Sequence, residues 1–155
     1  MESEHVSYLQ VVTFILGTEE FAFDISSVKE VIRIPVITNV PKSQEYIKGV
    51  INLRGNVIPV IDLRKRFNII GSSDLHSSRI IVCDIFSVMI GLVVDAVLET
   101  RQIDTSCVEP PPTVAIGGIE NEYIAGVAKL EDRLLSLLHI DKILNLQEQE
   151  SLKEP

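Results

Sequence analysis

The feature of this sequence that most constrains its fold is an internal repeat. The pattern Ile-x-Gly-Val-x-x-Leu at residues 47–53 returns at residues 124–130, an offset of 77. An upstream pattern of apolar residues around a glutamate, at residues 23–34, returns at 92–103 with an offset of 69. The eight-residue difference falls in a stretch where prolines and glycines gather. One unit of roughly 60 residues therefore occurs twice, and two similar halves are predicted.

Within each unit the sequence reads as short strands joined by turns. Residues 50–53 and 57–61 are apolar runs, the second rich in β-branched side chains. Arg54-Gly55-Asn56 separates them, and its glycine and asparagine tolerate a positive φ. Asp62 stands before a polar stretch at residues 63–67, where an aspartate can cap free N–H groups. A hairpin followed by a capped helical turn is predicted here.

Two other stretches read as short helical turns. Ser27 and Glu30 have the spacing of a capping box, in which two side chains satisfy backbone N–H groups at a helix start. Residues 95–99 read as a second turn of the same kind. We therefore expect helical turns at residues 27–30 and 95–99.

Many short strands with frequent turn signals are typical of small barrels. The predicted fold is all-β, mainly strands with short helices, arranged as two packed barrels. Two barrels of about 60 residues would each bury too little apolar surface alone, so we expect a shared core. The expected limits of the domain are residues 8–146, with a first barrel repeat at 8–70, a second at 78–146, boundaries that can interleave, and a flexible tail at 147–155.

Composition and charge narrow the range of functions. A chain of 155 residues with 46% apolar and 23% charged residues is typical of one globular domain. The net charge of −8 argues against nucleic acid as a partner, because phosphate backbones are bound by basic surfaces. Arg64-Lys65-Arg66 is the one dense basic cluster. We interpret it as a solvated turn near a helix end, with an anion site as the alternative.

The sequence gives little sign of export or membrane insertion. No apolar run reaches the roughly 18 residues of a transmembrane helix. The acidic start at residues 1–5 lacks the basic and apolar segments of a signal peptide. We therefore expect a cytoplasmic protein, with Cys83 and Cys107 as reduced structural thiols.

No arrangement of residues indicates catalysis. His5, His76 and His139 lie far apart, with no ligand spacing near either cysteine. His139 takes the place that Asp62 has in the other copy, and we interpret it as a capping or hydrogen-bonding residue. Convergence of Asp84 with His139 in space stays open. We expect no enzyme activity, no metal and no cofactor.

Binding is the remaining class of function, and the repeat indicates candidate positions. The copies agree at Val28 with Val97, Glu30 with Glu99, and Gly49 with Gly126. They differ at the hairpin turn, where Arg54 corresponds to Glu131. Arg54 can form a bidentate contact with a partner's carboxylate, or pair with an acid of its own chain. Gly49 indicates either a bulge or the close approach of a partner's backbone.

The stretch GVINLRGNVIPVIDLRKRF, residues 49–67, resembles the central motif of the CheW family, the adaptors of bacterial chemotaxis. Residues 21–32, 91–99 and 124–135 resemble the family too, and the similarity covers about residues 9–146. The resemblance implies two SH3-like five-stranded β-barrels packed together, without enzymatic activity. His139 is a departure, because many members carry aspartate there.

The resemblance also implies partners. Family members bind the regulatory domain of the histidine kinase CheA and the cytoplasmic tips of chemoreceptors, in a ternary complex recruited to membrane-bound arrays. Matched motif by motif, the implied interaction positions are Val28, Glu30, Gly49, Arg54, Val97 and Gly126. Arg54 is implied to be a hub near the receptor interface, and Val28 and Val97 to line an apolar groove between the barrels. The kinase contact is implied near Thr18 and residues 37–42.

Two alternatives stand beside a chemotaxis adaptor. A CheW-like scaffold for a signalling array outside chemotaxis would have the same fold and the same binding positions. A small-molecule binding barrel would instead need a closed pocket with convergent polar groups.

Overall fold

The computed structural model describes residues 7–41, 44–70, 76–113, 119 and 121–144. The expected tail at 147–155 lies outside this range. No helix in the described ranges has the length and apolar character to span a bilayer. The elements are, in chain order, β1 (Tyr8–Leu16), β2 (Glu19–Asp24), η1 (Ile25–Ser27), β3 (Val28–Arg33), β4 (Ile47–Leu53), β5 (Asn56–Asp62), α1 (Leu63–Arg66), β6 (Arg79–Ile85), β7 (Val88–Val94), β8 (Ala96–Asp104), η2 (Thr105–Cys107), β9 (Val108–Glu109), η3 (Asn121–Tyr123), β10 (Ile124–Lys129), β11 (Leu134–Leu138) and η4 (Ile140–Lys142).

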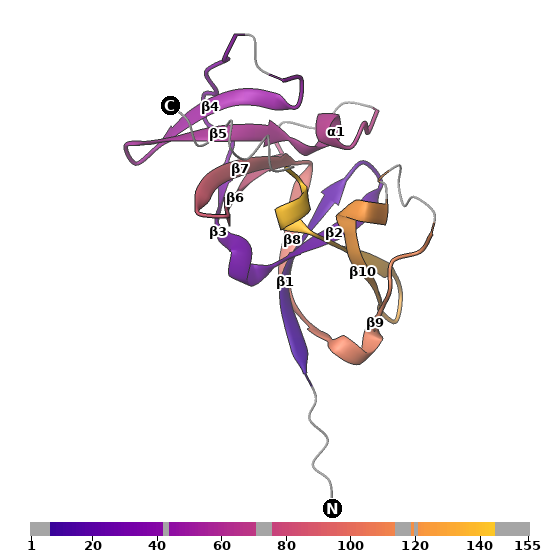
Figure 1. Cartoon of the computed structure of the whole chain (residues 1–155). Helices are drawn as coiled ribbons and strands as arrows, with labels where there is room; N and C mark the ends of the chain where they lie inside the picture. The colour runs from indigo at the N-terminus through magenta and orange to yellow at the C-terminus, as the bar shows by residue number, and fades with distance from the viewer. Residues whose placement is uncertain (1–6, 42–43, 71–75, 114–118, 120, 145–155) are drawn as a thin grey trace, which may run out of the picture.

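The strands form two sheets that pack together, which confirms the predicted all-β fold (Figure 1). One sheet has the order β3-β6-β7-β5-β4, and the other has the order β8-β1-β2-β11-β10-β9. The second sheet has six strands rather than five, because β9 pairs with β10 over two residues. The equivalent contact in the first sheet is the single bridge between Thr38 and Val50.

Each sheet is built from both repeat units. The hairpin β1–β2 of the first unit lies in a sheet with β8 to β11 of the second unit. The hairpin β6–β7 of the second unit lies in a sheet with β3 to β5 of the first unit. Parallel pairs complete the exchange, with Phe21 of β2 opposite Ser136 and Val60 of β5 opposite Gly91. Residues 8–70 and 78–146 are thus units of sequence, and the chain crosses between the sheets at η1 and again at Asp95.

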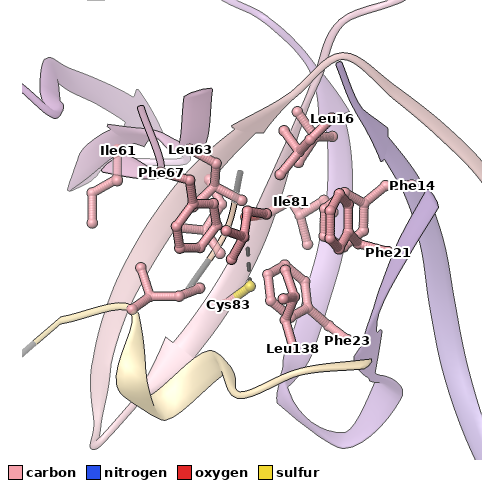
Figure 2. Close-up of a cluster of buried hydrophobic side chains, with 14 of the residues drawn as sticks. Phe14, Leu16, Phe21, Phe23, Ile61, Leu63, Phe67, Ile81, Cys83 and Leu138 are labelled. Atoms are coloured by element: carbon pink, nitrogen blue, oxygen red, sulfur yellow. Dashed lines mark hydrogen bonds between the residues drawn. The ribbon is translucent and has the colours of Figure 1, made fainter. Parts of the chain in front are cut away.

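The largest cluster of buried side chains lies between the two barrels. Figure 2 shows phenylalanines 14, 21 and 23 of one sheet facing Ile81 and Cys83 of the other. Among the described residues this cluster holds twenty buried side chains, against six in the separate interior of each barrel. The two interiors consist of Val11, Ala22, Ile103, Ala128, Leu135 and Leu137, and of Ile51, Ile58, Val60, Ile80, Val82 and Val93. The expected shared core is therefore confirmed, and it is what holds the barrels together.

Two predicted helical turns are wrong. The stretch 27–30 lies mainly in β3, and the 3₁₀ turn η1 comes earlier, capped by Asp24, whose Oδ1 accepts the Ser26 N–H at 2.9 Å. The stretch 95–99 lies mainly in β8. Both strands carry a bulge, and a bulge breaks the two-residue alternation by which a strand is identified from its sequence. Pairing with β6 and with β1 decides the structure here, because each strand forms a ladder with a buried neighbour.

Candidate functional site

Five of the six predicted interaction residues lie at register shifts in the sheets. The shifts fall at equivalent positions of the two repeat units: between Val28 and Glu30 in β3, Val97 and Glu99 in β8, Ile47 and Gly49 in β4, and Ile124 and Gly126 in β10. A bulge bends its strand and re-aims the side chains beside it. The agreement of the two copies at these positions therefore has a structural cause that is independent of any partner.

The glycines at two of these bulges are required by the packing of the chain itself. Gly49 has a φ of +150°, and a Cβ there would lie 2.2 Å from the carbonyl oxygen of Thr38. At Gly126 a Cβ would lie 2.8 Å from Cγ1 of Val108 and 3.0 Å from the carbonyl oxygen of Glu109. The bulge interpretation of Gly49 is confirmed, and the atoms that exclude a side chain belong to this protein.

Two other predicted residues, Glu30 and Arg54, meet as an ion pair. Arg54 and Gly55 have φ values of 50° and 85°, as in the primed turns that suit hairpins. This turn follows β4 and contains Arg54. Nη1 of Arg54 donates to Oε1 of Glu30 at 3.1 Å, and Nη2 donates to Oε2. Of the two alternatives for Arg54, pairing with an acid of its own chain is the one the structure contains. The pair joins β3 to the β4–β5 turn, and β3 and β4 are the two outer strands of their sheet.

This ion pair is open to solvent. The Arg54 side chain is 68% exposed and the Glu30 side chain 31% exposed. The hydrogen bonds and positive charge of Arg54 lower the pKa of the Glu30 carboxyl from its ordinary value. Because water surrounds both groups, the pair adds little to stability and can open at low cost.

Val28 and Val97 occupy equivalent positions in opposite sheets. Both are half-buried and pack against the central cluster, so their exposed atoms face out from the junction between the barrels. A shallow pocket of about 250 Å³ lies between β1, η1 and β8. Its lining residues are Gln10, Ile25, Thr100, Arg101 and Gln102.

The second repeat unit has an ion pair that the sequence interpretation missed. Arg133 donates from Nη2 to Oε1 of Glu99 at 3.2 Å, and its Nε lies 3.0 Å from Oε2 of Glu20. Glu99 is the equivalent of Glu30, so in both units an arginine of the hairpin turn binds the glutamate of the bulge. The arginine stands two residues later in the second unit, which is why aligning Arg54 with Glu131 hid it. The Glu20 side chain is only 11% exposed, so the Arg133–Glu20 contact is more shielded than the first pair, whereas the Glu99 side chain is 49% exposed.

The interpretation of Arg64-Lys65-Arg66 as a solvated turn is wrong for both arginines. Arg64 binds Asp95 with two hydrogen bonds of 2.6 Å, and both side chains are at least 85% buried. Arg66 donates to the carbonyl oxygen of Ile143 at 2.7 Å and stands over the ring of Tyr46, 4.9 Å from its centre. Both arginines connect α1 to elements of the other sheet or to the crossover that leads into it. Both guanidinium groups bind groups of the protein itself, which argues against an anion site.

The residues considered for catalysis have local contacts. Asp84 accepts a hydrogen bond from the Ser87 N–H at 2.8 Å. His139 is the residue immediately before η4, its side chain makes no capping hydrogen bond, and its Nδ1 lies 3.9 Å from Oδ1 of Asp141. The capping role expected for His139 is therefore wrong. Among the described residues, no group of three or more His, Cys, Asp or Glu side chains could hold a metal ion. Cys83 is buried in the central cluster, and burial raises the pKa of its thiol.

Comparison with known proteins places the chain in a family. The model of the CheW-like domain matches residues 10–148. The chain belongs to the CheW-like family. Chemotaxis protein CheW of Klebsiella aerogenes is 35% identical over 135 residues, which cover 87% of this chain and 81% of that protein. Chemotaxis protein CheW of Treponema pallidum is 32% identical over 147 residues, covering 92% and 86%.

The fold agrees with a solved structure of the same family. The crystal structure of the scaffolding protein TtCheW from Thermoanaerobacter tengcongensis superimposes with a TM-score of 0.83 at 37% sequence identity. The match covers 96% of this chain and 95% of that one. The predicted architecture of two packed SH3-like barrels is thereby confirmed. Proteins of this family are non-catalytic scaffolds or adaptors of chemotaxis, and this chain is one of them, so it is not an enzyme.

Proposed function

We propose that this protein is a cytoplasmic adaptor that couples chemoreceptors to the histidine kinase CheA in a ternary signalling complex. The observation that carries the proposal is the family match over residues 10–148, together with relatives named as chemotaxis protein CheW. The protein would be recruited to membrane-bound receptor arrays by its partners. It would not enter the bilayer itself.

The receptor surface in this proposal lies at the junction of the two barrels. Val28 and Val97 offer apolar atoms from equivalent strands of opposite sheets, and a receptor tip is helical. An amphipathic helix in an apolar groove is a common mode of recognition. The exposed pair of Glu30 and Arg54 adds groups that can form charge-assisted hydrogen bonds with a partner. Gly49 and Gly126 act through the fold, by allowing the bulges that aim these strands.

The kinase surface in this proposal lies in turns and loops rather than on the strands that carry Val28 and Val97. It comprises the β1–β2 turn near Thr18 and the loop at residues 37–42, of which residue 42 lies outside the described residues. Separate surfaces allow both partners to bind at once. Coupling further requires that receptor binding changes the populations of kinase states.

Titration calorimetry tests the proposal with two purified partners, the CheA regulatory domain and a cytoplasmic receptor fragment from the same source. We expect saturable one-to-one binding of the kinase domain. We expect Val28→Thr and Val97→Thr to weaken receptor binding by about tenfold, since each places a hydroxyl in an apolar contact. Val57→Thr is the matched control, because Val57 is an exposed valine at the start of β5.

Two results would count against the proposal, the first against the adaptor function and the second against the site assigned to the receptor. The first is no binding of either partner at tens of micromolar. The second is equal loss of receptor affinity in Val57→Thr and in the two junction variants, which would mean that the junction is not the receptor surface. A small-molecule barrel is disfavoured because apolar side chains fill the interior of each barrel.

A further inference from the structure

Asp95 lies at the point where the chain leaves one sheet for the other. It is the single residue between β7 and β8, and these strands belong to different sheets. Its backbone N–H donates to the carbonyl oxygen of Ile15 in β1 at 3.0 Å. Val97 follows two residues later and pairs with Phe14 of the same strand. The position of Asp95 therefore decides where β8, and with it Val97, begins along β1.

The carboxylate of Asp95 is bound from both barrels. Oδ1 accepts the Arg64 Nε–H at 2.6 Å, while Oδ2 accepts Arg64 Nη2 at 2.6 Å and the Gly17 N–H at 2.7 Å. Arg64 belongs to α1, which follows β5 of one sheet, and Gly17 lies in the β1–β2 turn of the other. The side chains of Arg64 and Asp95 are 15% and 13% exposed. A bidentate, shielded pair of this kind is stronger than a surface ion pair and fixes geometry as well.

Comparison of the two repeat units shows that only one of the two equivalent crossovers has residues that can form this contact. Ser26 takes the place of Asp95 in the other crossover, and Asp141 takes the place of Arg64 in the other unit. At that crossover the Ser26 N–H bonds to Asp24 within the same exposed turn. The contact of Arg64 with Asp95 is therefore an addition to the repeated fold, at one of two equivalent crossovers.

We propose that the Arg64–Asp95–Gly17 contact is a clamp that sets the angle between the two barrels and positions Val97 for receptor binding. The proposal rests on the receptor function proposed for the junction. In this role Arg64 and Asp95 are positioning residues that act on the receptor through β8. The β1–β2 turn of the proposed kinase surface contains Gly17 of the clamp. This turn should keep its geometry in variants that leave an oxygen to accept the Gly17 N–H.

Two conservative variants test the clamp. Arg64→Lys keeps the charge and removes the planar fork that binds both carboxylate oxygens. Asp95→Asn keeps an oxygen for the Gly17 N–H and removes the charge. Lys65→Gln is the matched control, since Lys65 is the exposed neighbour of Arg64 in the same helix. If Arg64→Lys fails to fold, Asp95→Asn carries the test alone.

The first readout is the distance between spin labels on the two barrels, measured without any partner. Val57→Cys and Leu134→Cys place labels at equivalent, exposed positions of β5 and β11, one in each sheet. Cys107→Ser removes the half-buried thiol, and Cys83 is buried. We expect the distribution of distances to broaden or shift in both clamp variants and to stay unchanged in Lys65→Gln.

The second readout is binding. We expect the clamp variants to bind the receptor fragment about five- to tenfold more weakly, and the kinase domain within twofold of wild type. Unchanged label distances and receptor affinity would overturn the clamp. An equal loss of affinity for both partners, with a lower melting midpoint, would mean that the contact only stabilises the fold, and this result would also overturn the clamp. Failure of the wild-type chain to bind the receptor fragment would overturn the receptor function itself, while the label distances still report on the clamp.

Discussion

The two repeat units share their backbone geometry and differ in the side chains that hold it. Both have bulges at the same positions of the repeat. Both also repeat a backbone hydrogen bond of 2.8 Å, from Asp62 N–H to Tyr46 in one unit and from His139 N–H to Tyr123 in the other. Sequence identity between the units is low, so these backbone features are what the fold needs from each copy.

The ion pairs at the bulge glutamates show the difference most clearly. Glu30 binds Arg54 in an exposed pair, whereas Arg133 binds Glu99 and the mostly buried Glu20 together. An exposed pair stabilises little and can open for a partner, whereas a shielded network loses stability when one member is removed. The comparison therefore assigns a mainly structural role to the contact of Arg133 with Glu20 and leaves the pair of Arg54 with Glu30 available for binding.

The largest effect is expected at the bulge glycines. Gly49→Ala should lower the free energy of unfolding by about 3 kcal/mol, because its Cβ would collide with a backbone carbonyl at a positive φ. Gly126→Ala should cost about 1–2 kcal/mol, because its closest neighbour is a side chain that can shift. Urea unfolding measures both. Gly55→Ala is the control, with a positive φ but open space around it, and should cost about 1 kcal/mol. A cost at Gly126 equal to that at Gly49 would contradict this difference between the units.

The next largest difference is expected between Arg133 and Arg54, the arginines of the two hairpin turns. Arg133→Ala should lower the free energy of unfolding by about 1–2 kcal/mol, since it leaves the shielded Glu20 without its ion pair. Arg54→Ala should leave the melting midpoint nearly unchanged and weaken partner binding instead. Thermal melts beside titration with the receptor fragment measure the contrast. The assignment of roles fails if Arg54→Ala is the more destabilising of the two.

A smaller difference in stability is expected between the residues that precede α1 and η4. Oδ1 of Asp62 accepts the Arg64 N–H at 3.0 Å, which confirms the predicted cap of α1, whereas His139 has no such bond. Asp62→Ala should therefore cost about 1 kcal/mol, and His139→Ala close to none. Chemical denaturation of both variants checks this. A large loss in His139→Ala would show that the histidine holds η4 by another contact.

The smallest effect concerns protonation. The carboxyl of Glu30 should titrate below its ordinary pKa of about 4.3, because Arg54 stabilises the charged form. Since the folded state lowers this pKa, the contribution to stability is present above the ordinary value and is lost as pH falls through the folded one. Carbon NMR of the Glu30 carboxyl measures it. In Arg54→Ala the pKa should return towards the ordinary value, and an unchanged low value would mean that another group holds the charge.

The sequence was sufficient for the repeat, most of the strands and the family, because each depends on local pattern; it failed at the starts of β3 and β8, where bulges break that pattern. The cap at Asp62 was predicted from cap chemistry, and a bulge was one of the two alternatives for Gly49; the structure contains both the cap and the bulge. The exchange of hairpins between the units could not be predicted. Two units with similar apolar patterns offer each hairpin two equivalent sheets, and only packing in three dimensions decides between them.

The contacts between charged side chains could not be predicted from the sequence either. Arg64 and Asp95 lie 31 residues apart, on elements that meet only after the sheets have packed. The equivalence of Arg133 to Arg54 was missed because the arginine stands two positions later in the second repeat unit than in the first. The predicted roles of Val28, Glu30, Arg54 and Val97 in binding stay predictions, since their positions at the bulges and at the barrel junction are equally explained by the fold.

The measurement that tests the adaptor function most directly is sedimentation velocity of this protein mixed with the CheA regulatory domain and the receptor fragment together. If the kinase and receptor surfaces are separate, one species should contain all three components, and adding receptor fragment should not displace the kinase domain. A mixture that holds only binary complexes, with each partner displacing the other, would contradict a coupling role and would show that the two surfaces overlap.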